Sequence, residues 1–236
     1  MEWFARDFDH PLYFQIYQNK EHEADEEGPA LAAMLGLPSG SLVLDLPCGW
    51  GRLRPALEAR EFRVVGGDLS ALNLRRHAAE YPGLMARLDF RALPFRNGCA
   101  DGVFCAFTSW GYFASEAENL RQLTEFARVL KPGGVLLLDL VGRIYLENAT
   151  RRVGQDWFWA DGYRERVRWS ADRKRILTDR ILDGIRFRHD IWIPTDREVS
   201  TFLEEAGFVI DRTFGDLGGG PLGPEAERRI YRALKS

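Results

Sequence analysis

Three carboxylates stand at the ends of short apolar runs, where a parallel sheet would gather a ligand. They are Asp45, Asp68 and Asp89, and a polar loop over 107–113 follows the next apolar run. Because open α/β sheets bind ligands at the carboxyl ends of their strands, we expect these groups to line one crevice.

The segment 43–52 reads VLDLPCGWGR, which predicts a strand, a glycine-bearing turn and the start of a helix. Gly49 and Gly51 remove side chains where a ligand approaches the backbone closely. Such a turn serves dinucleotides, whose pyrophosphate binds a helix N-terminus, or S-adenosylmethionine, which carries an ammonium and a sulfonium instead. Asp45 would repel a pyrophosphate and attract the cationic methionine end. The absence of a third glycine and of Gly-Lys-Ser/Thr also disfavours a dinucleotide fingerprint and a P-loop.

The next two carboxylates suit the rest of such a cofactor. Asp68 lies 19 residues after Gly49, where a carboxylate can bind both hydroxyls of a ribose, although it can equally cap the following helix. Asp89 can accept a hydrogen bond from an adenine amino group, and Phe90 can pack on the ring.

The elements that must position these groups alternate between short apolar runs and helical segments. This alternation predicts βαβ units and a mostly parallel sheet. The expected strands are 42–46, 62–67, 85–88, 102–107 and 135–140, and the expected helices are 50–60, 71–80 and 116–130. A helical preface is expected over 10–37. After the fifth strand, the alternating pattern over 163–193 predicts an antiparallel meander of about three strands, followed by a helix over 195–206 and strands over 208–214 and 229–234.

Composition narrows the class of protein. The 236 residues carry a net charge of −3, with 28% charged and 45% apolar residues, which argues against nucleic-acid or membrane binding. The N-terminus is charged, and no apolar run approaches the roughly 20 residues of a membrane span. The three cysteines lack metal-ligand spacing. We expect a cytoplasmic protein without a metal, either a monomer or a weak homodimer.

Four motifs taken together resemble the class I S-adenosylmethionine-dependent methyltransferases, in the layout of the branch that acts on small molecules. They are VLDLPCGWGR, VVGGDLS, LDFRALPF with DGVFCAFTSWGYF, and ARVLKPGGVLLLDL. The resemblance covers about residues 10–140 and, more loosely, the last two strands. It implies an α/β, Rossmann-like fold whose seven-stranded, mostly parallel sheet has helices on both faces and a reversed C-terminal strand.

We expect a single domain over 1–236 with the meander inserted after the fifth strand. Its expected parts are an N-terminal helical cap (1–40), a cofactor-binding core (41–140), an antiparallel substrate cap (150–194) and a C-terminal helix with a strand pair (195–236).

The resemblance also implies contacts with S-adenosylmethionine. It implies Asp45, Cys48 and Gly49 at the methionine end, Thr108 near the same moiety, Asp68 at the ribose, Leu69, Asp89 and Phe90 at the adenine, and Tyr13 or Tyr17 closing over the cofactor. Pro47 departs from the family, which usually has glycine there, so we expect a slightly reshaped turn with binding retained.

The acceptor side is less defined. An in-line methyl transfer needs a base only for a hydroxyl or ammonium acceptor, and the candidate bases are Tyr112, Asp139 and His189. We interpret His189 rather as a core histidine, whereas Asp139 is equally consistent with a turn-stabilising carboxylate. The expected substrate pocket comprises Trp110, Tyr112, Phe113 and Trp157, although Trp157 can equally join the meander to the main sheet.

The leading hypothesis is a methyltransferase that acts on a small molecule and yields S-adenosylhomocysteine. The alternatives are an RNA or protein acceptor and a non-catalytic S-adenosylmethionine-binding protein. Only the 12 basic against 7 acidic residues over 143–188 support the first alternative, and this pattern also fits a solvated sheet face. Pro47 leaves open the second alternative, a non-catalytic S-adenosylmethionine-binding protein. A nicotinamide oxidoreductase is disfavoured by Asp45.

Overall fold

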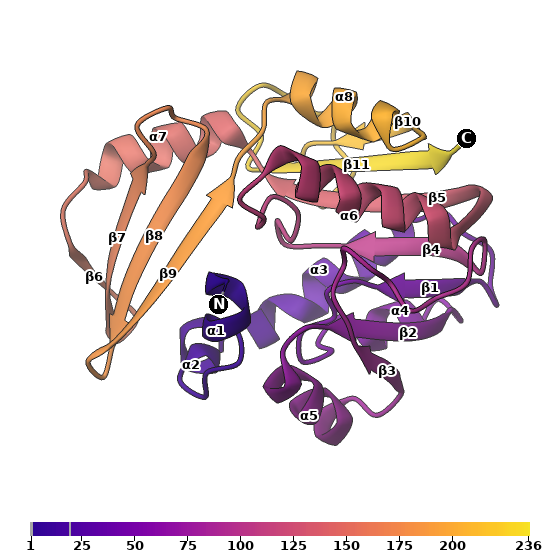
Figure 1. Ribbon diagram of the computed structural model, residues 1–236, viewed down its shortest axis with the longest axis horizontal. Coiled ribbons are helices and arrows are strands. Elements are labelled where there is room, and N and C mark those ends of the chain that lie inside the picture. Colours follow the sequence, from indigo (N-terminus) through magenta and orange to yellow (C-terminus); the bar gives the residue numbers. More distant parts are fainter. Residues whose placement is uncertain (1, 19) are drawn as a thin grey trace.

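The computed structural model describes residues 2–18 and 20–236 and contains two sheets (Figure 1). Seven strands form the larger sheet in the order β10-β11-β5-β4-β1-β2-β3, and β11 runs antiparallel to both of its neighbours. The strands are β1 (Leu42–Asp45), β2 (Arg63–Asp68), β3 (Leu84–Arg87), β4 (Ala100–Cys105), β5 (Leu130–Val141), β10 (Phe208–Phe214) and β11 (Arg228–Lys235). The predicted mostly parallel sheet with a reversed C-terminal strand is confirmed.

Helices cover both faces of this sheet (Figure 1). They are α3 (Lys20–Met34), α4 (Arg54–Glu58), α5 (Ala71–Glu80), α6 (Glu116–Val129) and α8 (Asp196–Glu205). Leu123 and Phe126 of α6 join Leu203 of α8 in one buried cluster, and Leu31 of α3 joins Leu57 of α4 in another. Because the central strands are buried on both faces, they have continuous apolar runs.

Local signals set the helix boundaries. The Oγ of Ser115 accepts a hydrogen bond from the backbone N–H of Glu118 at the start of α6. Thr195 and Glu198 form a reciprocal capping box at the start of α8. Each cap satisfies backbone donors that have no partner inside the helix.

The smaller sheet is antiparallel, with strands β6 (Phe158–Ala160), β7 (Tyr163–Trp169), β8 (Arg175–Leu182) and β9 (Ile185–Trp192) in that order. The sequence predicts about three strands here, and the structure adds β6 and the preceding helix α7 (Arg143–Val153). Three residues are too few to show alternation, and α7 has no buried residue to mark one apolar face. Asp183 and Gly184 make the tight turn between β8 and β9 with positive φ at both positions.

Two short helices, α1 (Trp3–Asp7) and α2 (Tyr13–Tyr17), lie between the two sheets (Figure 1). Helix α1 packs against β9. The segment after it reaches the start of α5, beside the larger sheet, where the hydroxyl of Ser70 donates to the carbonyl of Phe8 and the carboxylate of Asp9 accepts from the N–H of Leu72. The N-terminal segment therefore connects both sheets. None of the helices in the described ranges is long and apolar enough to span a bilayer.

Candidate active site

A cavity of about 220 Å³ lies at the carboxyl ends of the central parallel strands, beneath the N-terminal helices and β9. Its lining includes these residues predicted to contact a cofactor: Tyr13, Tyr17, Asp45, Cys48, Gly49, Asp68, Leu69, Asp89 and Phe90. Gly51 and Thr108, also predicted as contacts, lie outside the lining. The fold therefore brings the acidic strand ends together in one space.

Asp45 at the end of β1 is 2% exposed and faces this cavity. Among the described residues, none donates a hydrogen bond to its carboxylate. Burial raises the pKa of Asp45 to about 8, and the nearby charge of Asp68 adds to the rise, although Arg52 opposes it. A buried carboxylate without donors is unfavourable, and a cationic ligand would supply the missing partner.

Asp68 at the end of β2 holds the glycine turn in place. Its Oδ2 accepts from the N–H of Gly49 at 2.9 Å, and its Oδ1 accepts from the N–H of Ser70 at 2.8 Å. Burial raises the pKa of Asp68 to about 6, and these backbone hydrogen bonds limit the rise. Ser70 rather than Asp68 caps α5, through its Oγ and the N–H of Asn73. Each oxygen of Asp68 retains a lone pair for a ligand hydroxyl.

The two glycines of the turn serve different purposes. Both have positive φ, +54° at Gly49 and +86° at Gly51. A Cβ at Gly49 would meet nothing within 4 Å, so this position is open. A Cβ at Gly51 would lie 2.4 Å from the ring of His77, so the glycine there makes room for packing beneath the turn. The preceding Leu46–Pro47 peptide bond is cis.

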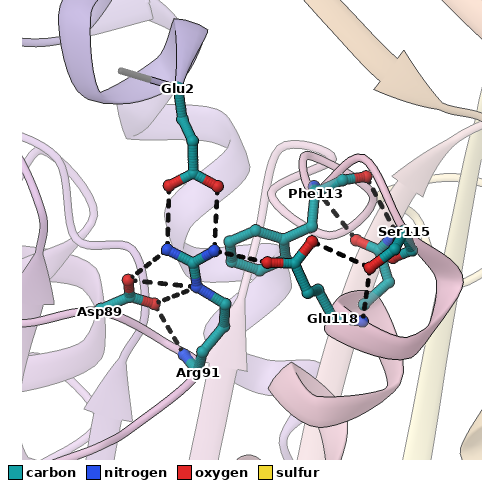
Figure 2. Close-up of polar contacts among 7 residues, drawn as sticks. Glu2, Asp89, Arg91, Phe113, Ser115 and Glu118 are labelled. Atoms are coloured by element: carbon teal, nitrogen blue, oxygen red, sulfur yellow. Dashed lines mark hydrogen bonds and ion pairs between the residues drawn. The ribbon is translucent and has the colours of Figure 1, made fainter.

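Asp89 is held by Arg91, which sequence reasoning missed. Figure 2 shows the Arg91 guanidinium among the carboxylates of Asp89, Glu2 and Glu118, with shortest contacts of 2.6, 2.9 and 2.7 Å. Partial burial by itself would raise the pKa of Asp89, but the hydrogen bonds from Arg91 outweigh it and lower this pKa. Because Glu2 precedes α1, this cluster attaches the N-terminal segment to the edge of the cavity.

One end of the cavity is mainly aromatic. The residues there are Phe4, Phe8, Tyr13, Tyr17, Tyr112, Phe113, His189 and Ile191. The ring of Phe8 lies 5.7 Å from that of Tyr112 and 5.8 Å from that of His189, measured between centroids. Sequence reasoning missed Phe4 and Phe8, although the aromatic residues of the N-terminal stretch were a visible signal.

Two residues expected in the substrate pocket lie elsewhere. Trp110 is buried in the core, where its Nε1 donates to the carbonyl of Asn119 at 2.9 Å. Trp157 lies beneath the guanidiniums of Arg164 and Arg166 on the small sheet, 5.3 and 4.9 Å from its ring centroid. Neither lines the cavity.

The candidate base Asp139 has its own partners. Its carboxylate accepts from Arg228 Nη2 at 2.6 Å and from the N–H of Phe107 at 2.9 Å. Thr108 completes this junction, because its Oγ1 accepts from the N–H of Val141. Asp139 and Thr108 therefore tie the loop after β4 to β5, whereas Tyr112 and His189 lie in the cavity. Among the described residues, no group of His, Cys, Asp or Glu could hold a metal ion.

Comparison with known proteins agrees with this architecture. Residues 43–134 match the family described as methyltransferase domain. Demethylmenaquinone methyltransferase of Thermus thermophilus is 39% identical over 130 residues, which cover 48% of this chain and 57% of that protein. The 2-phytyl-1,4-naphtoquinone methyltransferase of Thermosynechococcus vestitus is 28% identical over 200 residues, which cover 78% of this chain and 80% of that protein.

The fold itself is shared with a crystal structure of an S-adenosylmethionine-dependent methyltransferase from Clostridium acetobutylicum. The TM-score is 0.76 at 19% identity, and the match covers 94% of this chain and 98% of that one. Residues 43–134 thus match a methyltransferase domain, and the motifs and the sheet order agree with those of the class I S-adenosylmethionine-dependent methyltransferases.

Proposed function

We propose that this enzyme binds S-adenosylmethionine in the cavity and methylates a small aromatic acceptor. The observation that carries the proposal is the pair of buried carboxylates, Asp45 and Asp68, which end adjacent strands and face one cavity. One needs a cationic partner, and the other retains acceptor capacity for hydroxyls. The cofactor offers both, an ammonium and a ribose diol.

Each residue has a defined part in this proposal. Asp45 pairs with the ammonium, and the open turn at Gly49 admits the methionine portion beside Cys48. Asp68 accepts from the two ribose hydroxyls. Leu69 and Phe90 enclose the adenine, and Asp89 accepts from its amino group. Tyr13 and Tyr17 of α2 close over the cofactor.

When bound, the cofactor supplies a methyl group on a sulfonium: the acceptor's electron pair forms the new bond to carbon as the carbon–sulfur bond breaks and its pair returns to sulfur. The protein aligns the acceptor and excludes water, which is most of what an in-line displacement requires. The ring of Tyr112, which lines the cavity, would offer a π face to the positive sulfonium.

The aromatic lining supports a flat, apolar acceptor. Phe4, Phe8 and Ile191 offer carbon surface, and the acidic groups of the cavity lie at the strand ends instead. Two of the related methyltransferases are named for quinone substrates, which are flat rings that carry oxygen. An acceptor of this shape fits the space better than a flexible polymer.

Isothermal titration with S-adenosylmethionine, S-adenosylhomocysteine and NADH tests the cofactor. We expect micromolar affinity for both adenosyl ligands, no binding of NADH, and at least about tenfold weaker binding by Asp68→Ala, which loses charged hydrogen bonds. Asp172→Ala, in an exposed turn of the small sheet, is the matched control and should bind as the wild type does. Folded wild-type protein that binds neither adenosyl ligand would contradict the proposal.

A further inference from the structure

A guanidinium outside the cavity, that of Arg228 at the start of β11, joins two buried carboxylates. Its Nη2 and Nε donate to Oδ2 and Oδ1 of Asp139 on β5, at 2.6 and 3.1 Å. Its Nη1 donates to Oε1 of Glu27 on α3 at 2.6 Å. Both carboxylates are buried, so water does little to balance their charges. None of these three residues lines the cavity, but each carboxylate contacts a residue that does.

The first of these cavity residues is Phe107, in the loop after β4. Phe107 and Thr108 have φ of +60° and +52°, a region that is unfavourable for residues with a Cβ and that persists only when the surroundings enforce it. Asp139 enforces it here. Its Oδ2 accepts from the N–H of Phe107, and its backbone carbonyl accepts from the N–H of Thr108, both at 2.9 Å. Because Arg228 orients the carboxylate of Asp139, it also sets where Phe107 stands in the cavity wall.

The second cavity residue is Arg52, which follows the glycine turn. Its Nη1 donates to Oε2 of Glu27 at 3.2 Å. Its Cζ lies 4.1 Å from the centroid of the Phe107 ring, and the Cζ of Arg228 lies 5.1 Å from the same centroid. Burial raises the pKa of Asp45, and the charge of Arg52 opposes this rise. Arg52 and Phe107 therefore lie at the end of the cavity where Asp45 is proposed to bind the ammonium.

We propose that Arg228 is a positioning residue for the methionine end of the cofactor site, because it holds Phe107 through Asp139 and Arg52 through Glu27. The inference rests on the proposed function, in which this end receives the methionine part. A planar guanidinium suits the task, since its fork donates to two carboxylates in fixed directions. Without it, Asp139 would be a buried charge without a counter-ion and Glu27 would keep only Arg52. Each carboxylate would then move or take up a proton, and the wall that it holds would shift.

The adenosine end of the cavity has separate supports. Backbone N–H groups hold Asp68, and Arg91 holds Asp89. Arg228 contacts neither of these carboxylates. A change at Arg228 should therefore weaken the binding of the methionine part and leave the binding of the adenosine part unchanged.

Isothermal titration with S-adenosylhomocysteine and with adenosine separates the two ends, because adenosine lacks the amino-acid part. Arg228→Met should weaken the binding of S-adenosylhomocysteine about tenfold and leave that of adenosine within about twofold. Arg228→Lys keeps the charge but not the fork, so it should weaken S-adenosylhomocysteine binding about threefold. Arg232→Met is the matched control, because Arg232 lies on the same strand, has a similar exposed side-chain fraction (15% against 18%) and pairs with Asp211 instead. It should bind both ligands as the wild type does.

Glu27→Gln tests the connection through α3. This variant should weaken S-adenosylhomocysteine binding about threefold and leave adenosine binding unchanged, because it loosens Arg52 alone. Combined with Arg228→Met, it should cause no further loss, since both changes remove the same connection. Additive losses would show that Glu27 acts independently of Arg228 and would overturn the connection through α3.

Equal affinities of the wild type and Arg228→Met for S-adenosylhomocysteine, or equal losses for both ligands, overturn the inference. Adenosine binding by a variant also reports that the variant is folded, and Arg228→Lys decides the question if Arg228→Met does not fold. Failure of the wild type to bind S-adenosylhomocysteine counts against the proposed function. Wild-type binding that Arg228→Met leaves intact counts against the role of Arg228 alone.

Discussion

Asp45 and Asp179 are both buried carboxylates, but the protein surrounds them in opposite ways. Asp45, 2% exposed, has no donor among the described residues. Asp179, 0% exposed on the small sheet, forms ion pairs with four guanidiniums. They belong to Arg166, Arg168, Arg186 and Arg188, at 3.0, 3.1, 3.0 and 2.8 Å.

The pKa values follow from these surroundings. Burial raises the pKa of Asp45 to about 8. Burial also acts on Asp179, but the hydrogen bonds and charges of its arginines outweigh it and lower the pKa to about 2. A carboxylate with its own counter-ions stabilises the fold, whereas one without them costs stability and favours a cationic ligand. The difference separates a structural ion cluster from a binding site.

The largest effect is expected at Asp179. Asp179→Asn removes the counter-charge of four arginines, so the free energy of unfolding should fall by about 3 kcal/mol. This loss is near the low end of the range for breaking a buried ion pair, because the arginines are partly exposed. Urea denaturation measures the change. Asp172→Asn, at an exposed position, is the control, and its free energy of unfolding should stay within about 0.5 kcal/mol of the wild-type value. Because the folded pKa is depressed, this stabilisation is present above about pH 4 and is lost as the pH falls toward 2. An Asp179→Asn protein as stable as the wild type would show that solvent already screens the cluster.

Asp45 should show the opposite dependence on pH. Its folded pKa is raised, so its stabilising contribution is fully present below about pH 4 and is lost as the pH rises toward 8. Between about pH 6 and pH 7, the wild type should lose about 1.4 kcal/mol relative to Asp45→Asn. Denaturation of both proteins at the two pH values gives this difference.

The same group predicts proton release on ligand binding. To pair with an ammonium, Asp45 must ionise, so S-adenosylmethionine binding near pH 7 should release close to one proton. Titration calorimetry in two buffers of different ionisation enthalpy measures it. If Asp45→Asn releases as many protons on binding as the wild type does, the proton comes from another group and Asp45 does not pair with the ammonium.

The smallest effect is expected at Glu2, which joins the N-terminal segment to Arg91 (Figure 2). Glu2→Gln removes a partly exposed ion pair, so affinity for S-adenosylhomocysteine should fall about two- to threefold at low salt and less at high salt. Glu118→Gln removes another carboxylate from the same guanidinium without touching that segment. If both variants weaken binding equally, Arg91 acts through Asp89 and not through the N-terminal segment.

Much of the fold was predictable because its signals are local. Apolar runs and the Gly49 turn each depend on neighbours within a few residues. They fix the order of strands and helices, and this order alone places Asp45, Asp68 and Asp89 at one edge of a parallel sheet. The positions of these carboxylates therefore followed from the sequence.

Contacts between distant residues were not predictable in this way. Arg91 meets Glu2 across 89 residues, and Arg180 meets Tyr17 across 163. The same holds for Trp110, whose aromatic character fits a pocket as well as the core it occupies. Residue type gives a side chain its chemistry, but only packing selects its partners.

The sequence by itself determined the parallel sheet, its acidic strand ends and the glycine turn, because periodicity and turn chemistry act over a few residues. Only the tertiary structure decided that Asp45 lacks a hydrogen-bond donor among the described residues, that Asp179 has four arginine partners, and that Arg180 lies against His189. These states depend on burial and on charges brought from other strands, and neither quantity exists until the chain has folded.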